Sequence, residues 1–274
     1  MIDRDLIKRA LAEDLQGGQD ITSVATVSGD EKIVADFTAR KSGVVAGIGM
    51  ARAVLEEVGL TDIAVLVKDG ASVKSGEVLM TVRGDTRAIL LAERTALNFL
   101  GHLSGIATLT RTWVDAVAGT NCIIRDTRKT TPGMRLLEKY AVRMGGGTNH
   151  RMSLSDAALI KDNHIAAAGG VAQAFSKVRE KFPTSEIEIE VDTLDQLREV
   201  LPLKPDLVLL DNMSPAQCAE AVSIVAGATK LEASGGITLD NAKAYALTGV
   251  QFLAIGALTH SAPVFDIGLD LRAE

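Results

Sequence analysis

The sequence contains little of what several classes of protein require. Aromatic residues make up only 3% of the 274 positions, so Leu, Ile, Val and Ala must fill the interior. Base stacking on exposed rings is therefore not expected, and the net charge of −6 also argues against nucleic acid as a partner. No uninterrupted apolar run approaches the ~20 residues needed to span a bilayer, so we expect no membrane association.

Cysteine and targeting signals are equally scarce. The two cysteines, Cys122 and Cys218, lie far apart in segments typical of a strand and a helix, so buried free thiols are favoured over a disulfide. Residues 1–5 lack the basic start and the apolar stretch of a signal peptide. These features predict a cytoplasmic protein.

Familiar catalytic motifs are also missing. The histidines show neither HxH nor HExxH spacing, which leaves zinc catalysis without support. A serine nucleophile elbow, a Walker loop and a Rossmann fingerprint are likewise missing from the sequence.

Positive charge is concentrated in one part of the chain. Residues 125–164 contain eight Lys or Arg against four acids, so this segment carries +4 and the remainder −10. A basic island in an acidic protein suits a small polyanionic substrate better than a long polyanion. The alternative is a chance cluster on a solvated face.

From residue 120 onward, short apolar runs alternate with helix-like segments. We expect helices at about 166–181, 193–200, 214–226 and 238–247, the last three opening at Thr193, Ser214 and Thr238 as N-caps. This alternation predicts a parallel sheet with helical crossovers. The expected strands are 122–125, 158–160, 187–191, 207–210, 230–233 and 252–255.

One expected strand carries carboxylates on a single face. Glu186, Glu188 and Glu190 alternate with apolar residues, and such a face would be costly beneath covering helices. It fits the interior of a barrel that opens into a polar site, where cations from neighbouring strands can pair with the acids. A doubly wound open sheet is the alternative architecture.

The first ~110 residues follow a different pattern. Residues 34–39 alternate as a strand does, and residues 68–79 space glycines and valines in a way that resembles biotinyl and lipoyl carrier domains. Such carriers present a modifiable lysine in a tight hairpin, and that signal is missing here. We therefore favour an α/β sandwich, joined to the barrel by a long apolar helix from about 90 to 118.

Polar residues follow the expected strands where each one ends. In a barrel, those carboxyl ends meet at one face, where active sites form. Two glycine-containing ends suit a phosphate, although each glycine alone could serve only a turn. The clustered cations suit a substrate with several negative groups, and the alternative is that they are solvated at the surface. The two acids suit hydroxyls or a magnesium–diphosphate unit, and the alternative is that they form structural ion pairs. In chain order these residues are Thr127, Arg128, Lys129, His150, Arg151, Lys161, Glu190, Asp211, Ser234, Gly235, Gly236, Ile255, Gly256 and Ala257.

Short runs of sequence, dense between residues 94 and 260, recur in a recognisable order. They are RTALNFL at 94–100, LSGIAT at 103–108, DTRKTTPG at 126–133, EKYAV at 138–142, GGGTNHR at 145–151, LIKDNHI at 159–165, EVD at 190–192, LDN at 210–212 and ASGGI at 233–237. In this order they resemble the quinolinate phosphoribosyltransferase family, also called carboxylating nicotinate-nucleotide diphosphorylases. The likeness covers nearly the whole chain.

The resemblance implies a fold and a set of residue roles. It implies an N-terminal α/β sandwich domain at 1–110, an open parallel, TIM-like α/β barrel at 111–260, and a segment at 261–274 that returns to the first domain. It further implies a homodimer with a shared active site, to which Arg94 would contribute from the partner subunit. Arg128, Lys129, His150, Arg151 and Lys161 would surround the quinolinate carboxylates and the diphosphate. Glu190 and Asp211 would bind ribose hydroxyls and Mg²⁺, and the two glycine-containing ends would hold the 5′-phosphate.

The implied reaction joins quinolinate to phosphoribosyl diphosphate in de novo NAD biosynthesis. The products would be nicotinate mononucleotide, diphosphate and CO₂, with Lys129 or Lys161 assisting the decarboxylation and no organic cofactor. Two rivals remain: a barrel phosphoribosyltransferase that acts on another pyridine acid without decarboxylation, and a noncatalytic carrier or scaffold built on the N-terminal part.

Overall fold

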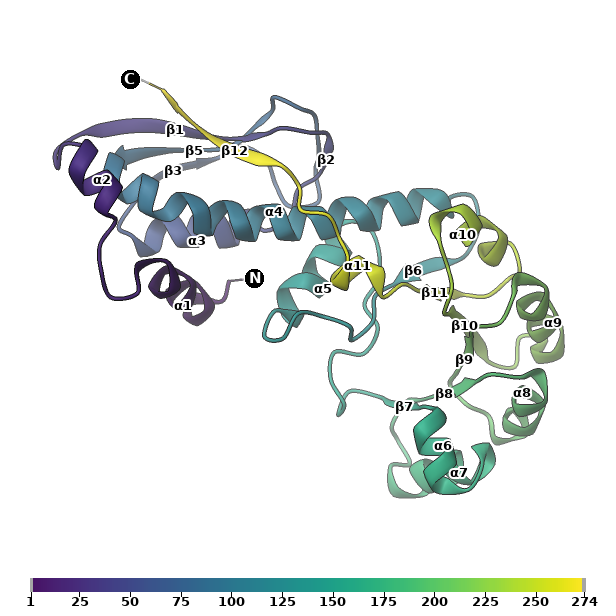
Figure 1. Ribbon diagram of the computed structural model, residues 1–274. Helices are drawn as coiled ribbons and strands as arrows, with labels where there is room; N and C mark the ends of the chain where they lie inside the picture. Colours follow the sequence, from purple (N-terminus) through teal and green to yellow (C-terminus); the bar gives the residue numbers. More distant parts are fainter. Residues whose placement is uncertain (1, 273–274) are drawn as a thin grey trace. The chain divides into compact units, whose positions relative to one another are not determined.

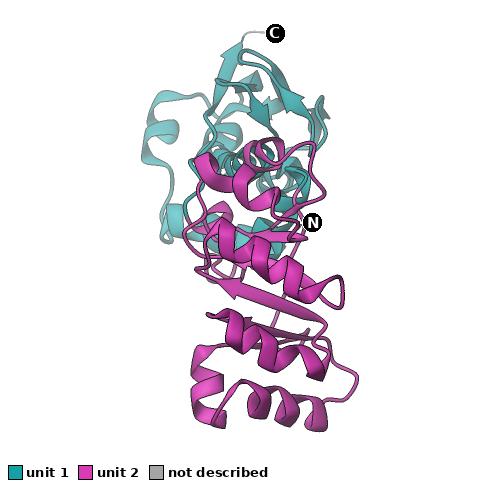
Figure 2. Ribbon diagram, turned by 90° about the vertical axis from the view of Figure 1, so that its right-hand side faces the viewer, with its two compact units in different colours: residues 1–111, 136–146, 261–274 teal, residues 112–135, 147–260 magenta. Residues whose placement is uncertain are grey.

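The computed structural model describes residues 2–272 and divides into two compact units (Figures 1 and 2). Unit 1 comprises residues 1–111, 136–146 and 261–274, and unit 2 comprises residues 112–135 and 147–260. Residues 136–146, which we expected within the barrel domain, thus group with unit 1. Both cysteines are buried and free, as predicted.

Unit 1 is built on a four-stranded antiparallel sheet in the order β12-β1-β5-β3. Its strands are β1 (Lys32–Ala39), β3 (Asp62–Val65), β5 (Val78–Asp85) and β12 (Ile267–Arg272), and a small second sheet pairs β2 (Gly43–Val44) with β4 (Ser72–Val73). The last strand, β12, pairs along β1 from Ile267 opposite Ala39 to Arg272 opposite Val34. The C-terminal segment therefore completes the sheet that residue 32 begins.

Helices complete unit 1 and form its apolar core with the sheet. They are α1 (Arg4–Leu15), α2 (Ile21–Thr26), α3 (Ile48–Glu57), α4 (Thr86–Ala116) and α5 (Arg135–Met144). The long helix α4 buries residues at spacings of three and four, which places them on one face: Ile89, Ala92, Ala96, Leu100, Leu103 and Ala107. Helices packed with an antiparallel sheet make this unit the expected α/β sandwich.

Two glycines explain how the C-terminal segment can lie against α4. A Cβ atom at Gly105 would collide with the carbonyl oxygen of Pro263, and one at Gly101 would crowd the carbonyl of Phe265. The Phe265 N–H donates to the Gly101 carbonyl at 2.9 Å. Glycine at these two helical positions therefore allows backbone to approach backbone.

Unit 2 contains a six-stranded, all-parallel sheet in the order β6-β11-β10-β9-β8-β7. The strands are β6 (Ile123–Arg125), β7 (Ala158–Ile160), β8 (Ile187–Val191), β9 (Leu207–Asp211), β10 (Lys230–Ser234) and β11 (Phe252–Ala254). All six match the expected strands to within one residue at each end. The sheet curves but leaves β6 and β7 as its two edges, so the barrel is open, as predicted.

Helices lie along the outer side of this curved sheet (Figure 1). They are α7 (Val171–Lys181), α8 (Leu194–Val200) with the 3₁₀ turn Leu201–Leu203, α9 (Pro215–Val225) and α10 (Leu239–Ala246). Two short helices, α6 (Asp162–Ala168) and α11 (Ala257–His260), follow β7 and β11. Thr193 and Ser214 accept hydrogen bonds from Gln196 and Gln217 as N-caps, and Thr238 occupies the same position before α10. All three N-cap predictions are confirmed.

The expected helix 166–181 was wrong as a single element. Gly169 and Gly170, with φ of 90° and 142°, end α6 and start α7 on a new axis. Residues with side chains rarely adopt either conformation, so the glycine pair marks the break.

Candidate active site

The carboxyl ends of the parallel strands bring the predicted polar residues of unit 2 to one edge of the sheet. Asp211 at the end of β9 is in register with Ser234 at the end of β10, and Glu190 on β8 is in register with Leu209 and through it with Glu232. Lys161 follows β7, and the segment 126–129 follows β6. These ends form the floor and rim of a polar site.

The inner face of the barrel carries charged side chains, as the alternation predicted. On β8, Ile187, Ile189 and Val191 are buried on one face, whereas Glu188 and Glu190 occupy the opposite face. Glu232 of β10 lies on the same inner face and is fully buried. Glu186 precedes the strand and is exposed, so the carboxylates that line the interior are the other two of the predicted three.

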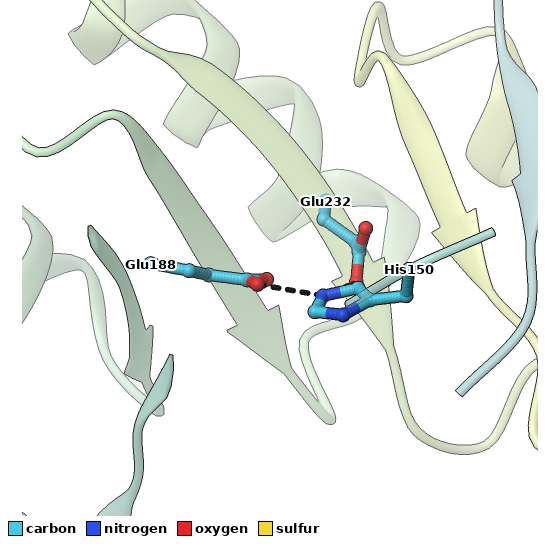
Figure 3. A group of neighbouring side chains, drawn as sticks. All are labelled: His150, Glu188 and Glu232. Carbon is cyan, nitrogen blue, oxygen red and sulfur yellow. Dashed lines mark hydrogen bonds and ion pairs between the residues drawn. The ribbon is translucent and has the colours of Figure 1, made fainter. Parts of the chain in front are cut away.

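Cations meet these carboxylates inside the barrel. Arg125 Nη1 at the end of β6 lies 2.8 Å from Glu232 Oε2, and its guanidinium stacks 4.3 Å from the centre of the Phe252 ring. His150 Nε2 lies 2.6 Å from Glu188 Oε2 and 3.5 Å from Glu232 Oε1. Figure 3 shows the His150 ring facing Glu188, with Glu232 beside it. Burial, followed by the charge of Glu188, raises the pKa of Glu232 to about 7.

A segment outside the strands holds His150 in place. Residues 147–151 run beside β6, where Thr148 forms a parallel bridge with Arg125. The fully buried Asp126 accepts from the His150 backbone N–H at 2.8 Å and from the Asn149 side-chain amide. Because the buried carboxylate of Asp126 accepts both hydrogen bonds, the side chains of residues 147–151 are held in a defined orientation toward the barrel interior.

Two arginines of the predicted set lie close enough to repel each other. Burial lowers the pKa of Arg151, and the positive charge of Arg128 lowers it further. Arg151 Nη1 donates to the Ala157 carbonyl at 3.0 Å, whereas Arg128 Nε is buried and has no hydrogen-bond partner within residues 2–272. Two half-buried guanidinium groups in proximity form a site that an anion would stabilise.

The predicted acids form a second group beside these cations. Lys161 Nζ lies 3.7 Å from Glu190 Oε2. Burial raises the pKa of Glu190; Lys161 opposes this shift and the charge of Asp211 adds to it. Burial also raises the pKa of Asp211, with a further contribution from Asp192, while Lys161 and Lys129 oppose the shift. The two carboxylates are thus electrostatic neighbours that share Lys161.

The glycine-containing strand ends are shaped by close contacts. Gly235 (φ 84°) and Gly236 (φ 63°) follow β10 in the left-handed region, and a Cβ at Gly235 would collide with Asn212. A Cβ at Gly256 would lie 3.0 Å from Lys129 Cδ, so the lysine stem passes along this glycine. Thr259 Oγ1 donates to the Lys129 carbonyl at 2.8 Å, and the Lys129 N–H donates to Thr127 Oγ1 at 3.0 Å. Ile255 and Ala257 flank Gly256 between β11 and α11.

A cavity of about 680 Å³ lies beside the edge strand β7. Its wall is mostly apolar, and Leu154 and Phe182, which line it, are exposed. Arg151 and His164 also line this cavity. The cavity is therefore adjacent to the predicted site, at the open side of the barrel.

One member of the predicted set belongs to the other unit. Arg94 lies on α4 in unit 1 with an exposed side chain. All other predicted site residues lie in unit 2. The role implied for Arg94 in a partner's site stays a prediction.

Arg125, Asp126 and Glu232 were missed as site residues. Glu232 had a signal, because Lys230, Glu232 and Ser234 alternate with Leu231 and Ala233 just as the acids of β8 alternate with apolar residues. Arg125 ends β6 and Asp126 follows it; Asp126 is fully buried, and a buried carboxylate needs hydrogen-bond donors from a neighbouring segment.

Comparisons with known proteins agree with this architecture. Family models match the quinolinate phosphoribosyl transferase N-terminal domain over residues 20–104 and its C-terminal domain over residues 106–270. The nicotinate-nucleotide pyrophosphorylase [carboxylating] of Mycobacterium leprae is 53% identical over 98% of this chain and 96% of its own. A crystal structure of a NadC deletion mutant has a TM-score of 0.96 at 37% identity, covering 99% of this chain and 96% of that one. The nicotinate-nucleotide pyrophosphorylase of Ehrlichia chaffeensis has a TM-score of 0.94 at 40% identity and 98% coverage of both chains.

Strand ends that gather arginines, lysines and carboxylates suit anionic substrates, and the matching family models place the chain in the class of phosphoribosyl transferases. Within that class, this chain belongs to the quinolinate phosphoribosyltransferase family. Among residues 2–272, no helix combines the length and the apolarity that crossing a membrane demands.

Proposed function

We propose that this protein transfers the phosphoribosyl group of phosphoribosyl diphosphate to quinolinate, releasing diphosphate and CO₂ and forming nicotinate mononucleotide for NAD biosynthesis. The observation that carries this proposal is the polar edge of the barrel, where the partly buried Arg128 and Arg151 are joined by Lys161, whose Nζ lies 3.7 Å from Glu190 Oε2. The relative from Mycobacterium leprae, named a carboxylating nicotinate-nucleotide pyrophosphorylase, supports the same conclusion.

The cations of the site suit a dicarboxylate and a diphosphate together. Guanidinium groups bind carboxylates through paired hydrogen bonds, so Arg128 and Arg151 are the proposed ligands of quinolinate. Lys129 and Lys161, which both act on the charge of Asp211, are placed to neutralise the diphosphate. The single carboxylate of nicotinate would satisfy only part of this set.

The donor set of Glu190 and Asp211 fits Mg²⁺. Both are carboxylates, both have a pKa raised by burial, and the charge of Asp211 raises the pKa of Glu190 further, so a divalent cation would relieve their mutual repulsion. When bound, Mg²⁺ would neutralise charge on the departing diphosphate. The same two side chains are proposed to hold the ribose hydroxyls.

The first chemical stage separates diphosphate from the ribose carbon. The C–O bond breaks with its electron pair on the diphosphate, and Lys129 and Lys161 stabilise that developing charge. The ribose carbon gains oxocarbenium character, which Glu190 and Asp211 can stabilise. The ring nitrogen of quinolinate, held by Arg128 and Arg151, then donates its lone pair to that carbon. The segment from Ser234 to Gly236 and residues 255–257 are the proposed cradle of the 5′-phosphate.

The second stage is decarboxylation of the pyridinium adduct. The bond from the ring carbon to the carboxylate next to the nitrogen breaks, and its electron pair remains on the ring carbon beside the positive nitrogen. A proton then replaces the lost CO₂. Lys129 Nζ and Lys161 Nζ are the two candidate donors, and the proposal leaves the choice between them open.

The active site is proposed to be shared within a homodimer. Arg94 is an exposed cation on α4, and the family resemblance gives it a role in the partner's quinolinate pocket. In this arrangement each site takes most of its residues from one subunit and one arginine from the other.

The test is turnover with purified protein, Mg²⁺ and phosphoribosyl diphosphate. Quinolinate is expected to support release of CO₂ and diphosphate, and nicotinate is not. Chelation of Mg²⁺ should stop the reaction, and its return should restore it. Equal rates with both acids would instead support the rival transferase that does not decarboxylate.

A further inference from the structure

The imidazole of His150 uses both of its nitrogens inside the protein. The Arg151 backbone N–H donates to His150 Nδ1 at 2.8 Å, so Nδ1 is the acceptor and carries no proton. The ring proton is therefore on Nε2, which lies 2.6 Å from Glu188 Oε2. The side chain is only 9% exposed. This pattern defines a neutral imidazole that donates to a buried carboxylate.

A neutral imidazole whose two nitrogens both form hydrogen bonds within the protein cannot also bind a substrate through them. An anion would need a donor, and the one ring N–H already donates to Glu188. A role as acid or base would likewise require breaking one of the two hydrogen bonds. The resemblance places His150 among the groups around the substrate, but its hydrogen bonds point toward the protein.

The same hydrogen bonds fix the peptide that carries Arg151. Asp126 Oδ1 accepts from the His150 N–H at 2.8 Å, and His150 Nδ1 accepts from the next N–H along the chain. Two successive backbone donors are thus held by two buried acceptors. Arg151 extends from this anchored backbone, and its guanidinium is repelled by that of Arg128. Without a rigid support, two like charges would move apart.

We infer that His150 is a positioning residue: a neutral imidazole that links Glu188 to the Arg151 backbone and so holds the Arg151 guanidinium near Arg128. The inference rests on the proposed function only for the identity of the anion that the two arginines bind.

A metal ion is the competing occupant of the same group. The potential ligand atoms of His150, Glu188 and Glu232 lie within 4.8 Å of one another, and all three side chains are buried. Metal binding needs an unprotonated ligand nitrogen, whereas Nε2 carries the ring proton. Arg125 Nη1 already supplies a positive charge to Glu232 at 2.8 Å. The hydrogen-bonded form and the metal-bound form therefore exclude each other.

The first experiment observes the ring directly. In protein labelled with ¹⁵N at histidine, His150 is assigned by the signal lost in His150→Asn, or by elimination with variants of His102, His164 and His260 if that variant does not fold. We expect one protonated and one unprotonated ring nitrogen, unchanged when quinolinate is added. Protonation of both nitrogens in the complex would overturn the inference, because His150 would then be a charged group facing the substrate.

The second experiment is a double-mutant cycle with the KM for quinolinate as the readout. His150→Asn and Arg151→Lys are each expected to raise KM about 10-fold or more, and the double variant no more than about 3-fold beyond the worse single variant. Effects that multiply would show that His150 binds the substrate independently. Glu188→Gln keeps an acceptor for Nε2–H without the charge and should change KM by less than about 3-fold. A rise in KM of about 10-fold in Glu188→Gln would mean that the ring is a charged imidazolium that the Glu188 carboxylate stabilises.

The third experiment tests the metal. Purified protein is titrated with Zn²⁺ by calorimetry, beside Glu232→Gln. Stoichiometric binding that the variant abolishes would overturn the inference, and its absence supports the hydrogen-bonded form. Neither the histidine spectrum nor this titration requires turnover, so both remain decisive if quinolinate proves not to be the substrate.

Discussion

Arg125 Nη1 and Glu232 Oε2 form an ion pair of 2.8 Å in which the glutamate side chain is fully buried. Removing one partner of a buried pair leaves an uncompensated charge, which costs about 3–5 kcal/mol of stability. Arg125→Met should therefore lower the free energy of unfolding by about this amount at about pH 8, where Glu232 is ionised, measured by chemical denaturation. The double variant Arg125→Met/Glu232→Gln should recover most of the loss.

An exposed pair of the same length provides the control. Arg198 Nη1 lies 2.8 Å from Asp195 Oδ1, and both side chains are at least half exposed. Arg198→Met should cost less than about 1 kcal/mol, because solvent screens such pairs. Equal losses in the two arginine variants would contradict the assigned difference in burial.

The stability of the protein should depend on pH through Glu232. Burial, with the nearby charge of Glu188, raises the pKa of Glu232 from 4.5 to about 7. The folded state then binds more protons than the unfolded state between these two values, so this group's contribution to stability falls as pH rises through that window. Glu232→Gln removes the titration. Wild-type protein should therefore lose more Tm than this variant on going from about pH 5 to about pH 8, and parallel Tm profiles would exclude the effect.

The alternation of side chains predicted the inner face of the barrel because strand geometry is local. Glu188 and Glu190 lie opposite Ile187, Ile189 and Val191 whatever the neighbouring strands are. The partner of a buried charge is not local: Arg125 and Glu232 are 107 residues apart, and only the strand order, with β11 between β6 and β10, brings them together. The sequence pattern could therefore predict that the polar strand ends lie at one edge of the sheet, but it could not predict which charged residues form ion pairs.

Binding of quinolinate should depend on the guanidinium geometry of Arg128 and Arg151. Arg151→Lys keeps the charge but loses the fork that matches a carboxylate. We expect the KM for quinolinate to rise about 10-fold or more, with a smaller effect on the KM for phosphoribosyl diphosphate. Lys177→Arg, which alters a cavity-lining cation outside the predicted set, is the control and should change neither constant appreciably. Steady-state kinetics with each substrate varied in turn decides between specific binding and general electrostatic attraction.

The turn after β10 should tolerate no side chain. At Gly235, φ is 84° and a Cβ would collide with Asn212, whose side chain donates to Asp211 Oδ2 at 2.6 Å. Gly235→Ala should therefore displace Asn212 and raise the KM for phosphoribosyl diphosphate about 10-fold or more. Gly227→Ala is a matched control, because φ is 83° there and nothing lies within 4 Å of its Cβ. It should carry only the backbone strain of about 1–2 kcal/mol and leave both KM values unchanged.

The proposed shared site makes a prediction about mixed dimers. Arg94→Ala and Lys161→Ala should each be inactive alone, since every site would lack one cation. Random exchange of subunits produces mixed dimers in which one of two sites has both residues, so about one quarter of wild-type activity should return. Arg151→Ala mixed with Lys161→Ala is the control: both residues would come from the same subunit, and every site would stay defective. Recovery in the first mixture and none in the second would show that Arg94 acts across the dimer, whereas no recovery in either would confine the site to one chain.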